Sequence, residues 1–252
     1  MIITIRSSFT LAVLLLLTAC AAFYTPRQPL PIAQVIAASK GDAPPQSVIQ
    51  RIRESGTTYA LRGSDFYKLK ALGVADPVLD FLQQSLVDDI DLLTRYSVTG
   101  MSLGGCSFCY PQPVDVDRQE SGFGVVPSTP PGRYVSGKPP GVPDWVPPYV
   151  RGTTSRISTE QIAEMIRNKT PEAEILEKIR GSLLSRVIGV GGWTNIRTRP
   201  MAGLAGAELA SLHDQGATNA VLDALQSKFM AQFIEAERLR YQNLGNGPGA
   251  NL

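Results

Sequence analysis

The spacing of apolar residues in the second half of the chain is typical of short amphipathic helices. Ser158 can cap a helix, with Gln161 in the capping-box position, and apolar side chains then recur on one face at Ile162 and Ile166. The segment after Ser158 is therefore expected to be a helix that buries this face.

Breaks in the pattern predict three more helices in this half. Thr170 and Pro171 predict a second start, with threonine as the cap and proline at the first helical position. A third helix is expected around residues 207–215 and closes at Gly216, because glycine readily takes the left-handed conformation that ends a helix. A fourth helix is expected to begin near Asn219 and to run to about Gln242.

The same succession of breaks and apolar positions occurs twice along the chain. Residues 31–55 align without gaps on residues 158–182 at a shift of 127, and residues 61–85 align on residues 204–228 at a shift of 143. Glycine and proline mark backbone positions rather than mere hydrophobicity, and they recur at the breaks. The matched pairs are Pro44 with Pro171, Gly63 with Gly206 and Gly73 with Gly216. The alternative is a chance similarity of helical patterns.

These patterns predict a mainly α-helical protein made of two copies of a four-helix unit. No short helix buries its apolar stripe alone, so the units must pack within themselves or on each other. The expected organisation is helical repeat 1 at residues 31–100, a Pro/Gly-rich segment at 101–157, helical repeat 2 at 158–243 and a flexible tail at 244–252.

The change of shift places about 16 extra residues in the second copy, at 185–200. Two runs of β-branched or aromatic residues flank Gly191 and Gly192, which predicts a small β-hairpin. The alternative is a helix that runs on into an irregular loop. Residues 61–82 have a loose likeness to sterile-alpha-motif-like interaction bundles, which implies a bundle fold and no particular function.

The middle segment, residues 101–157, differs in kind. Ten prolines fall between Pro111 and Pro148, which rules out helix there and disfavours central strands. Two interpretations are open: an extended strap over the helices with its aromatic residues buried, or a mobile connector whose aromatics bind a partner. A polyproline ligand for a partner domain is a third. The aromatic candidates for partner binding are Phe123, Tyr134, Trp145 and Tyr149.

Charge and histidine content limit the kinds of binding and catalytic site that the chain can form. The 252 residues carry a formal net charge of +2 and are 18% charged, which gives no reason to expect a nucleic-acid partner. The one histidine, His213, aligns with Lys70 of the first copy, so its position is expected to be exposed. A single histidine excludes most Ser-His-Asp, Cys-His and multi-histidine metal sites. No metal and no dissociable cofactor are expected.

The N-terminal sequence predicts the cellular localisation of the protein. Residues 9–19 form an apolar run too short to cross a bilayer as a helix and within the signal-peptide range. The run ends in Leu17-Thr18-Ala19-Cys20, which resembles the lipobox of bacterial lipoproteins. The resemblance implies that residues 1–19 are a signal peptide. It also implies that Cys20 carries a diacylglycerol and an N-acyl chain, and that residues 20–30 tether the body to a membrane.

Ala21 stands where an aspartate commonly signals inner-membrane retention, so the resemblance implies the outer membrane, with the body in the periplasm. Two or more acyl chains anchor a soluble domain stably, whereas one does not. The alternative is an uncleaved N-terminal transmembrane anchor.

The remaining thiols, Cys106 and Cys109, form a Cys-X-X-Cys pair. Export to an oxidising space favours a local structural disulfide. Redox catalysis and zinc binding are the alternatives, but Pro111 prevents a helix from starting on the motif, and zinc would need two more ligands. The acidic run Asp88, Asp89 and Asp91 is expected to be a solvated helix face, with an acidic interaction face or weak cation site as the alternative.

Together these features predict an outer-membrane lipoprotein that is not an enzyme. It is expected to act as a scaffold or accessory subunit of a cell-envelope assembly, with an envelope protein as its partner. The competing class is an enzyme, either a thiol oxidoreductase using Cys106 and Cys109 or an envelope hydrolase with an unrecognised site.

Overall fold

Eight helices make up about 70% of the residues that the computed structural model describes, so the predicted mainly α-helical class is confirmed. The described residues are 28–41, 43–99, 112–113, 116, 142–149, 155–185 and 204–245. The helices of the first half are α2 (Ile32–Lys40), α3 (Pro45–Ser55), α4 (Gly63–Ala71) and α5 (Asp76–Thr99). Those of the second half are α7 (Thr159–Arg167), α8 (Glu172–Gly181), α9 (Gly206–Asp214) and α10 (Asn219–Gly245).

The helix ends follow the local sequence. At the start of α7 the Gln161 N–H donates to Ser158 Oγ (3.2 Å), and the Ser158 N–H donates to Gln161 Oε1 (2.9 Å), which confirms the capping box. Gly73 and Gly216 follow α4 and α9 with φ of +91° and +102°, a region that favours glycine.

The expected start of α8 is wrong by one residue. Pro171 is extended, with ψ of 137°, and the helix begins at Glu172. The Pro171 carbonyl accepts the first helical bond, from the Glu174 N–H (3.0 Å), so proline precedes the helix, and no cap is made by Thr170.

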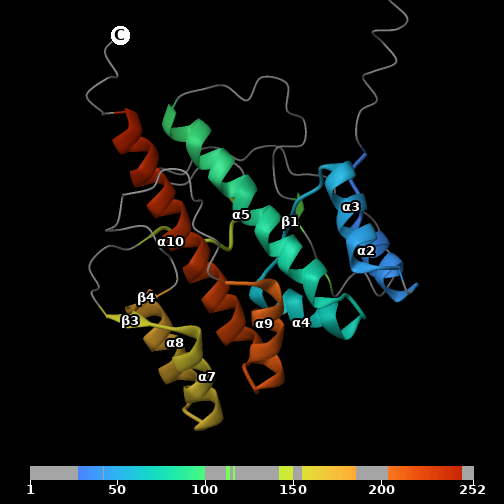
Figure 1. The fold of residues 1–252 in the computed structure, drawn as a ribbon. Helices are drawn as coiled ribbons and strands as arrows, with labels where there is room; N and C mark the ends of the chain where they lie inside the picture. Colours follow the sequence, from blue (N-terminus) through green and yellow to red (C-terminus); the bar gives the residue numbers. More distant parts are fainter. Residues whose placement is uncertain are drawn as a thin grey trace, which may run out of the picture.

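The two halves have the same order of helices. The starts of α7 and α8 lie 127 residues after those of α2 and α3, and the starts of α9 and α10 lie 143 residues after those of α4 and α5. Figure 1 shows α5 and α10 side by side, with α4 and α9 near their beginnings. The α2–α3 pair lies beside α5 on one flank, and the α7–α8 pair beside α10 on the other.

Two short parallel strand pairs tie loops to this helical frame. Strand β1 (Tyr59–Ala60) pairs with β2 (Gln112–Pro113), which comes from the proline-rich segment. Strand β3 (Arg156–Ile157) pairs with β4 (Leu183–Leu184), so the end of α8 is held against the residues that lead into α7. The hairpin expected within 185–200 lies almost wholly outside the described residues.

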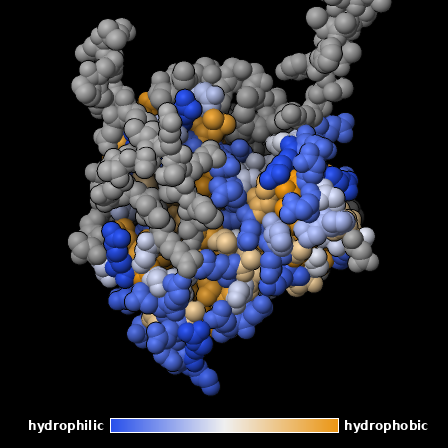
Figure 2. Space-filling view, in the orientation of Figure 1, coloured by the Kyte–Doolittle hydropathy of each residue, from blue (hydrophilic) through white to orange (hydrophobic). Residues whose placement is uncertain are grey.

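The halves share one hydrophobic core rather than two. Helix α4 packs on α9, α5 packs on α10, and α4 and α5 also pack on α10 and α9 respectively. In the view of Figure 2, hydrophilic residues cover most of the α7–α8 end, and hydrophobic residues gather between α3 and α5. The buried side chains of the long helices that belong to this cluster include Leu82, Leu86, Ile90, Leu222, Leu225 and Phe229.

Two glycines allow the central helices to approach each other. A methyl group at Gly63, the first residue of α4, would overlap the backbone carbonyl of Leu222 in α10. A methyl group at Gly206, the first residue of α9, would overlap the carbonyl of Leu79 in α5 and the Phe66 ring. Each contact joins one half of the chain to the other. Neither position has room for a side chain, so the packing requires glycine at both.

Aspartates cap these same helix starts across the halves. Asp223 Oδ1 accepts from the Ser64 N–H at the start of α4, and Asp80 Oδ1 accepts from the Ala207 N–H at the start of α9, both at 2.8 Å. A carboxylate at the N-terminal end of a helix satisfies a free donor and complements the helix dipole. The shared core is therefore fastened by polar contacts at its closest points.

We expect Gly63→Ala and Gly206→Ala each to lower the free energy of unfolding by about 2 kcal/mol or more, because the added methyl meets backbone that cannot move aside. Chemical denaturation of the purified variants measures the change. Gly181→Ala in α8 is the matched control, since its methyl meets nothing within 4 Å. Equal stability of all three variants would contradict the close approach.

Candidate functional site

Two groups of polar side chains lie along the line where α5 and α10 meet, which we term the α5–α10 seam. At its middle the side chains of Gln83 and Gln226, 1% and 0% exposed, face each other. The Gln83 amide donates to Gln226 Oε1 (3.0 Å), and the Gln226 amide donates to Gln83 Oε1 (2.8 Å). Each glutamine satisfies the other, as buried polar groups require.

Nearer the carboxyl ends of the two helices, the seam holds two acidic side chains. Tyr241 of α10 donates its hydroxyl to Asp91 Oδ1 of α5 (2.8 Å). The Glu237 carboxyl, on a residue 4% exposed, hydrogen-bonds to the Asp91 carboxyl and accepts from Arg240 Nη1 (2.7 Å). We term Asp91 and Glu237 the carboxyl pair.

The surroundings of the carboxyl pair favour a bound proton. Burial, followed by the charge of Asp91, raises the pKa of Glu237 to about 7, against a smaller lowering effect of Arg240. Burial and the hydrogen bond to Asp91 raise the pKa of the Tyr241 hydroxyl to about 12, so this phenol stays a donor. Glu237 therefore keeps its proton to a higher pH than an ordinary glutamate does.

The acidic run on α5 is not the solvated helix face that the sequence predicted. Asp88 bonds along its own helix, accepting from the Gln84 amide (2.9 Å). Burial raises the pKa of Asp89 to about 6, opposed by a hydrogen bond with Thr58. Asp91 is engaged across the seam. The apolar residues between them are drawn into the core, and the aspartates on the edges of that face are partly covered with them.

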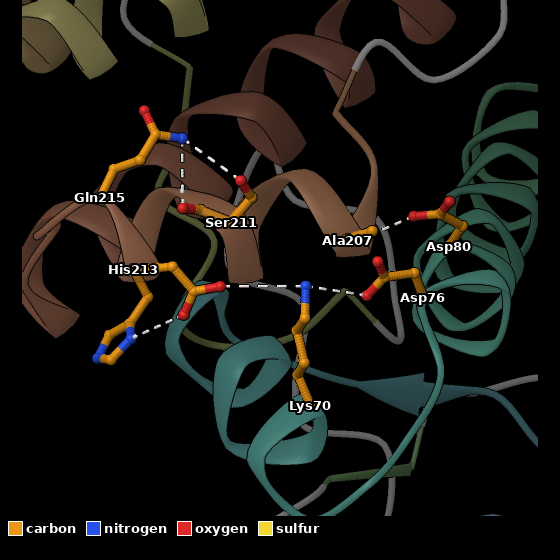
Figure 3. A network of polar contacts seen from close by, with 8 residues as sticks. Lys70, Asp76, Asp80, Ala207, Ser211, His213 and Gln215 are labelled. Atoms are coloured by element: carbon orange, nitrogen blue, oxygen red, sulfur yellow. Dashed lines mark hydrogen bonds and ion pairs between the residues drawn. The ribbon is translucent and has the colours of Figure 1, made fainter.

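His213 lies in a network of polar contacts on the α4–α9 surface. Lys70 extends from α4 to Asp76 at the start of α5 (3.1 Å), as Figure 3 shows, and also lies 4.0 Å from Asp214 of α9. The His213 side chain is 38% exposed, which confirms the expected exposure, and its ring stacks on Tyr67 with centroids 3.6 Å apart. The network joins the two halves at the surface, where His213 Nδ1 lies 3.9 Å from the exposed carboxylate of Asp214.

The described part of the proline-rich segment lies against the helical core. Val142 and Val146 are buried, and the half-buried Trp145 packs against the core cluster. Tyr149 is half-buried. The other sequence-predicted site residues, which are Cys20, Cys106, Cys109, Phe123 and Tyr134, lie outside the described residues.

Two features are absent among the described residues. No helix among them is long and apolar enough to cross a membrane. Among the same residues, no group of three or more histidine, cysteine or acidic side chains is placed to hold a metal ion.

Sequence reasoning missed the polar seam, although one signal was present. The repeat alignment sets Gln83 on Gln226, and a polar residue at the same place in two apolar helix faces marks a position that needs a partner. No comparable signal exists for Glu237, because the alignment places Thr94, not Asp91, opposite it.

Comparison with known proteins gives no relative for this arrangement: no family model, no curated protein and no solved structure matches the chain.

We expect Gln83→Leu to lower the free energy of unfolding by about 1–3 kcal/mol, because it leaves the Gln226 amide unpaired in an apolar seam. The double variant Gln83→Leu/Gln226→Leu removes both polar groups and should regain much of that loss in a double-mutant cycle. Gln46→Leu, at an exposed position of α3, is the control and should change stability by less than about 0.5 kcal/mol. Strictly additive losses in the double variant would show that the two amides act separately.

Proposed function

We propose that this chain is a bacterial outer-membrane lipoprotein whose helical body acts as a non-enzymatic scaffold or accessory subunit of a cell-envelope assembly. The observation that carries the proposal is the Leu17-Thr18-Ala19-Cys20 sequence at the end of a short apolar run. Cleavage before Cys20 and acylation of its thiol and amine leave the body on a short tether at the membrane surface. Two or more acyl chains hold such a body stably.

The body is, in this proposal, two copies of one four-helix unit. The helix starts support this interpretation, because α7 and α8 share one offset of 127 residues and α9 and α10 share another of 143. The reciprocal contacts of Gly63 with Leu222 and of Gly206 with Leu79 support it as well. The polar contacts have the same symmetry. Each half caps a helix of the other half with an aspartate, and each contributes one glutamine to the buried pair. Duplication gives two matching outer helix pairs, α2–α3 and α7–α8, on opposite flanks of a shared core. A rigid frame with two such faces suits protein–protein contacts.

The proline-rich segment is the proposed contact region for an envelope partner. Val142, Trp145 and Val146 fix one part of it on the core, so the rest of the segment starts from a defined place on the body. Its aromatic residues Phe123, Tyr134 and Tyr149 are the proposed contacts, because aromatic side chains supply large contact area at interfaces.

Metabolic labelling with a palmitate analogue tests the anchor. In a bacterial host, the wild-type protein should take up label and fractionate with the outer membrane, because Cys20 supplies the acceptor thiol. Cys20→Ala should lose the label. The variant Ser39→Ala, in α2, is the control and should label like the wild type. Equal labelling of wild type and Cys20→Ala would overturn the lipoprotein assignment.

Thiol counting separates the scaffold from the thiol-oxidoreductase alternative. With Cys20 acylated, we expect no alkylation of the isolated native protein, and two alkylated cysteines, Cys106 and Cys109, after denaturation with a strong reductant. Intact mass spectrometry measures both states. A pair that is reduced by mild thiol buffers in the native protein and oxidises other thiols would favour the enzyme instead.

A further inference from the structure

The proposed lipid tether joins the helical body at a fixed point beside α2 and α3. Leu30, which precedes α2, donates its N–H to Thr57 Oγ1 (2.8 Å), and its carbonyl accepts from the Tyr59 hydroxyl (2.6 Å). Thr57 and Tyr59 are buried and follow α3 closely. Leu30 comes ten residues after Cys20, and ten residues span at most about 36 Å. Acyl chains on Cys20 would therefore keep the α2–α3 pair close to the bilayer.

The exposed cations of the α2–α3 pair are matched by those of the α7–α8 pair on the opposite flank. Within these helices, three positions carry an exposed cation in both pairs at the repeat shift of 127. They are Lys40 with Arg167, Arg51 with Lys178 and Arg53 with Arg180. The Arg53 guanidinium also packs over the Phe81 ring of α5 (4.9 Å). The cations alone therefore do not distinguish the two flanks.

Acidic side chains do distinguish the two flanks. Helices α7 and α8 carry five exposed glutamates, and the residue at each equivalent position of α2 and α3 is uncharged. The pairs are Glu160 with Ala33, Glu164 with Ala37, Glu172 with Pro45, Glu174 with Ser47 and Glu177 with Gln50. Helices α2 and α3 carry one acid, Glu54, which accepts from the Gln50 amide (2.8 Å). The α2–α3 helices thus have a positive net charge and the α7–α8 helices a negative one, a difference that the intervening residues Asp42 and Lys169 reduce but do not remove.

We propose that the α2–α3 pair docks on the anionic phospholipid surface of the membrane that holds the acyl chains of Cys20. This inference rests on the lipoprotein assignment. Anionic headgroups attract cations and repel carboxylates within a Debye length, which is about 8 Å at physiological ionic strength. The short tether brings to this surface the flank that has the cations without the five glutamates. The α7–α8 pair lies across α5 and α10 from it, so docking turns the acidic flank away from the membrane (Figure 1).

Lipid-dependent quenching measures which flank meets the membrane. Gln46→Cys in α3 and Ala173→Cys in α8 change equivalent exposed positions, and each can carry the same fluorescent label. The lipidated protein is reconstituted in phosphatidylcholine vesicles with about one third phosphatidylglycerol and a headgroup-attached quencher, and the label at position 46 should be quenched about twofold more than that at position 173. Phosphatidylcholine alone, or about 1 M salt, where the Debye length is about 3 Å, should reduce this difference. Protein without an added cysteine gives the labelling background.

Charge variants separate electrostatic docking from the effect of the tether alone. Lys40→Gln/Arg51→Gln removes two exposed cations of the α2–α3 pair, keeps Arg53 on Phe81, and should reduce the extra quenching at position 46. Arg167→Gln/Lys178→Gln removes the equivalent cations of the α7–α8 pair and is the matched control, which should leave the extra quenching unchanged. The salt dependence of the protein with its native charges gives the same test without a change of charge.

The outcomes distinguish the docking surface from the anchor. Protein that does not float with the vesicles would overturn the lipoprotein assignment, and the docking with it. Protein that floats with equal quenching of both labels, or with stronger quenching at position 173, would overturn the docking alone. A preference for position 46 that persists in high salt and in Lys40→Gln/Arg51→Gln would also overturn it, because the tether would then be its only cause.

Discussion

The shared core depends on backbone meeting backbone at two glycines. At Gly63 and Gly206 the first turn of one helix lies directly on a carbonyl of a helix from the other half, Leu222 or Leu79. Any side chain there would push α4 from α10 or α9 from α5, and well-packed interiors tolerate little displacement. The aspartate caps bond to the same helix starts. The helices therefore approach each other closely at the points where their first N–H groups are hydrogen-bonded.

The α5–α10 seam between these central helices also buries polar side chains, and each of them needs a hydrogen-bonding partner. The Gln83 and Gln226 amides are partnered by reciprocal hydrogen bonds. Nearer the helix ends, Asp91 accepts from the Tyr241 hydroxyl and Glu237 accepts from Arg240. Buried polar networks whose members are partnered help to make the packing of a core unique.

Local features of the fold could be predicted from the sequence, because they depend on neighbours within one turn. The capping box at Ser158 and the left-handed glycines at Gly73 and Gly216 are of this kind. The exposure of His213 followed from its alignment with Lys70. The start of α8 was misplaced because proline suits both the cap and the first helical position, and only the ψ of Pro171 decides between them.

Contacts between distant residues could not be predicted in the same way. The acidic run on α5 has the sequence of a solvated face, and only the position of α10 shows that Asp91 meets Tyr241 and Glu237. The stacking of His213 on Tyr67 likewise depends on how α9 crosses α4. The two short parallel strand pairs join residues whose sequences carry no strand pattern, so their pairing is a consequence of where the helices place the loops.

The order of polar groups along the seam gives its two regions different properties. The amide pair of Gln83 and Gln226 does not titrate, so the middle of the seam, with its apolar neighbours, holds at any pH at which the protein is folded. The carboxyl pair lies about two turns further along α5 and about three along α10, near the ends of the long helices. The seam therefore joins the two long helices through neutral amides at its centre and through acidic, basic and phenolic groups nearer the helix ends, where the polar contacts depend on charge.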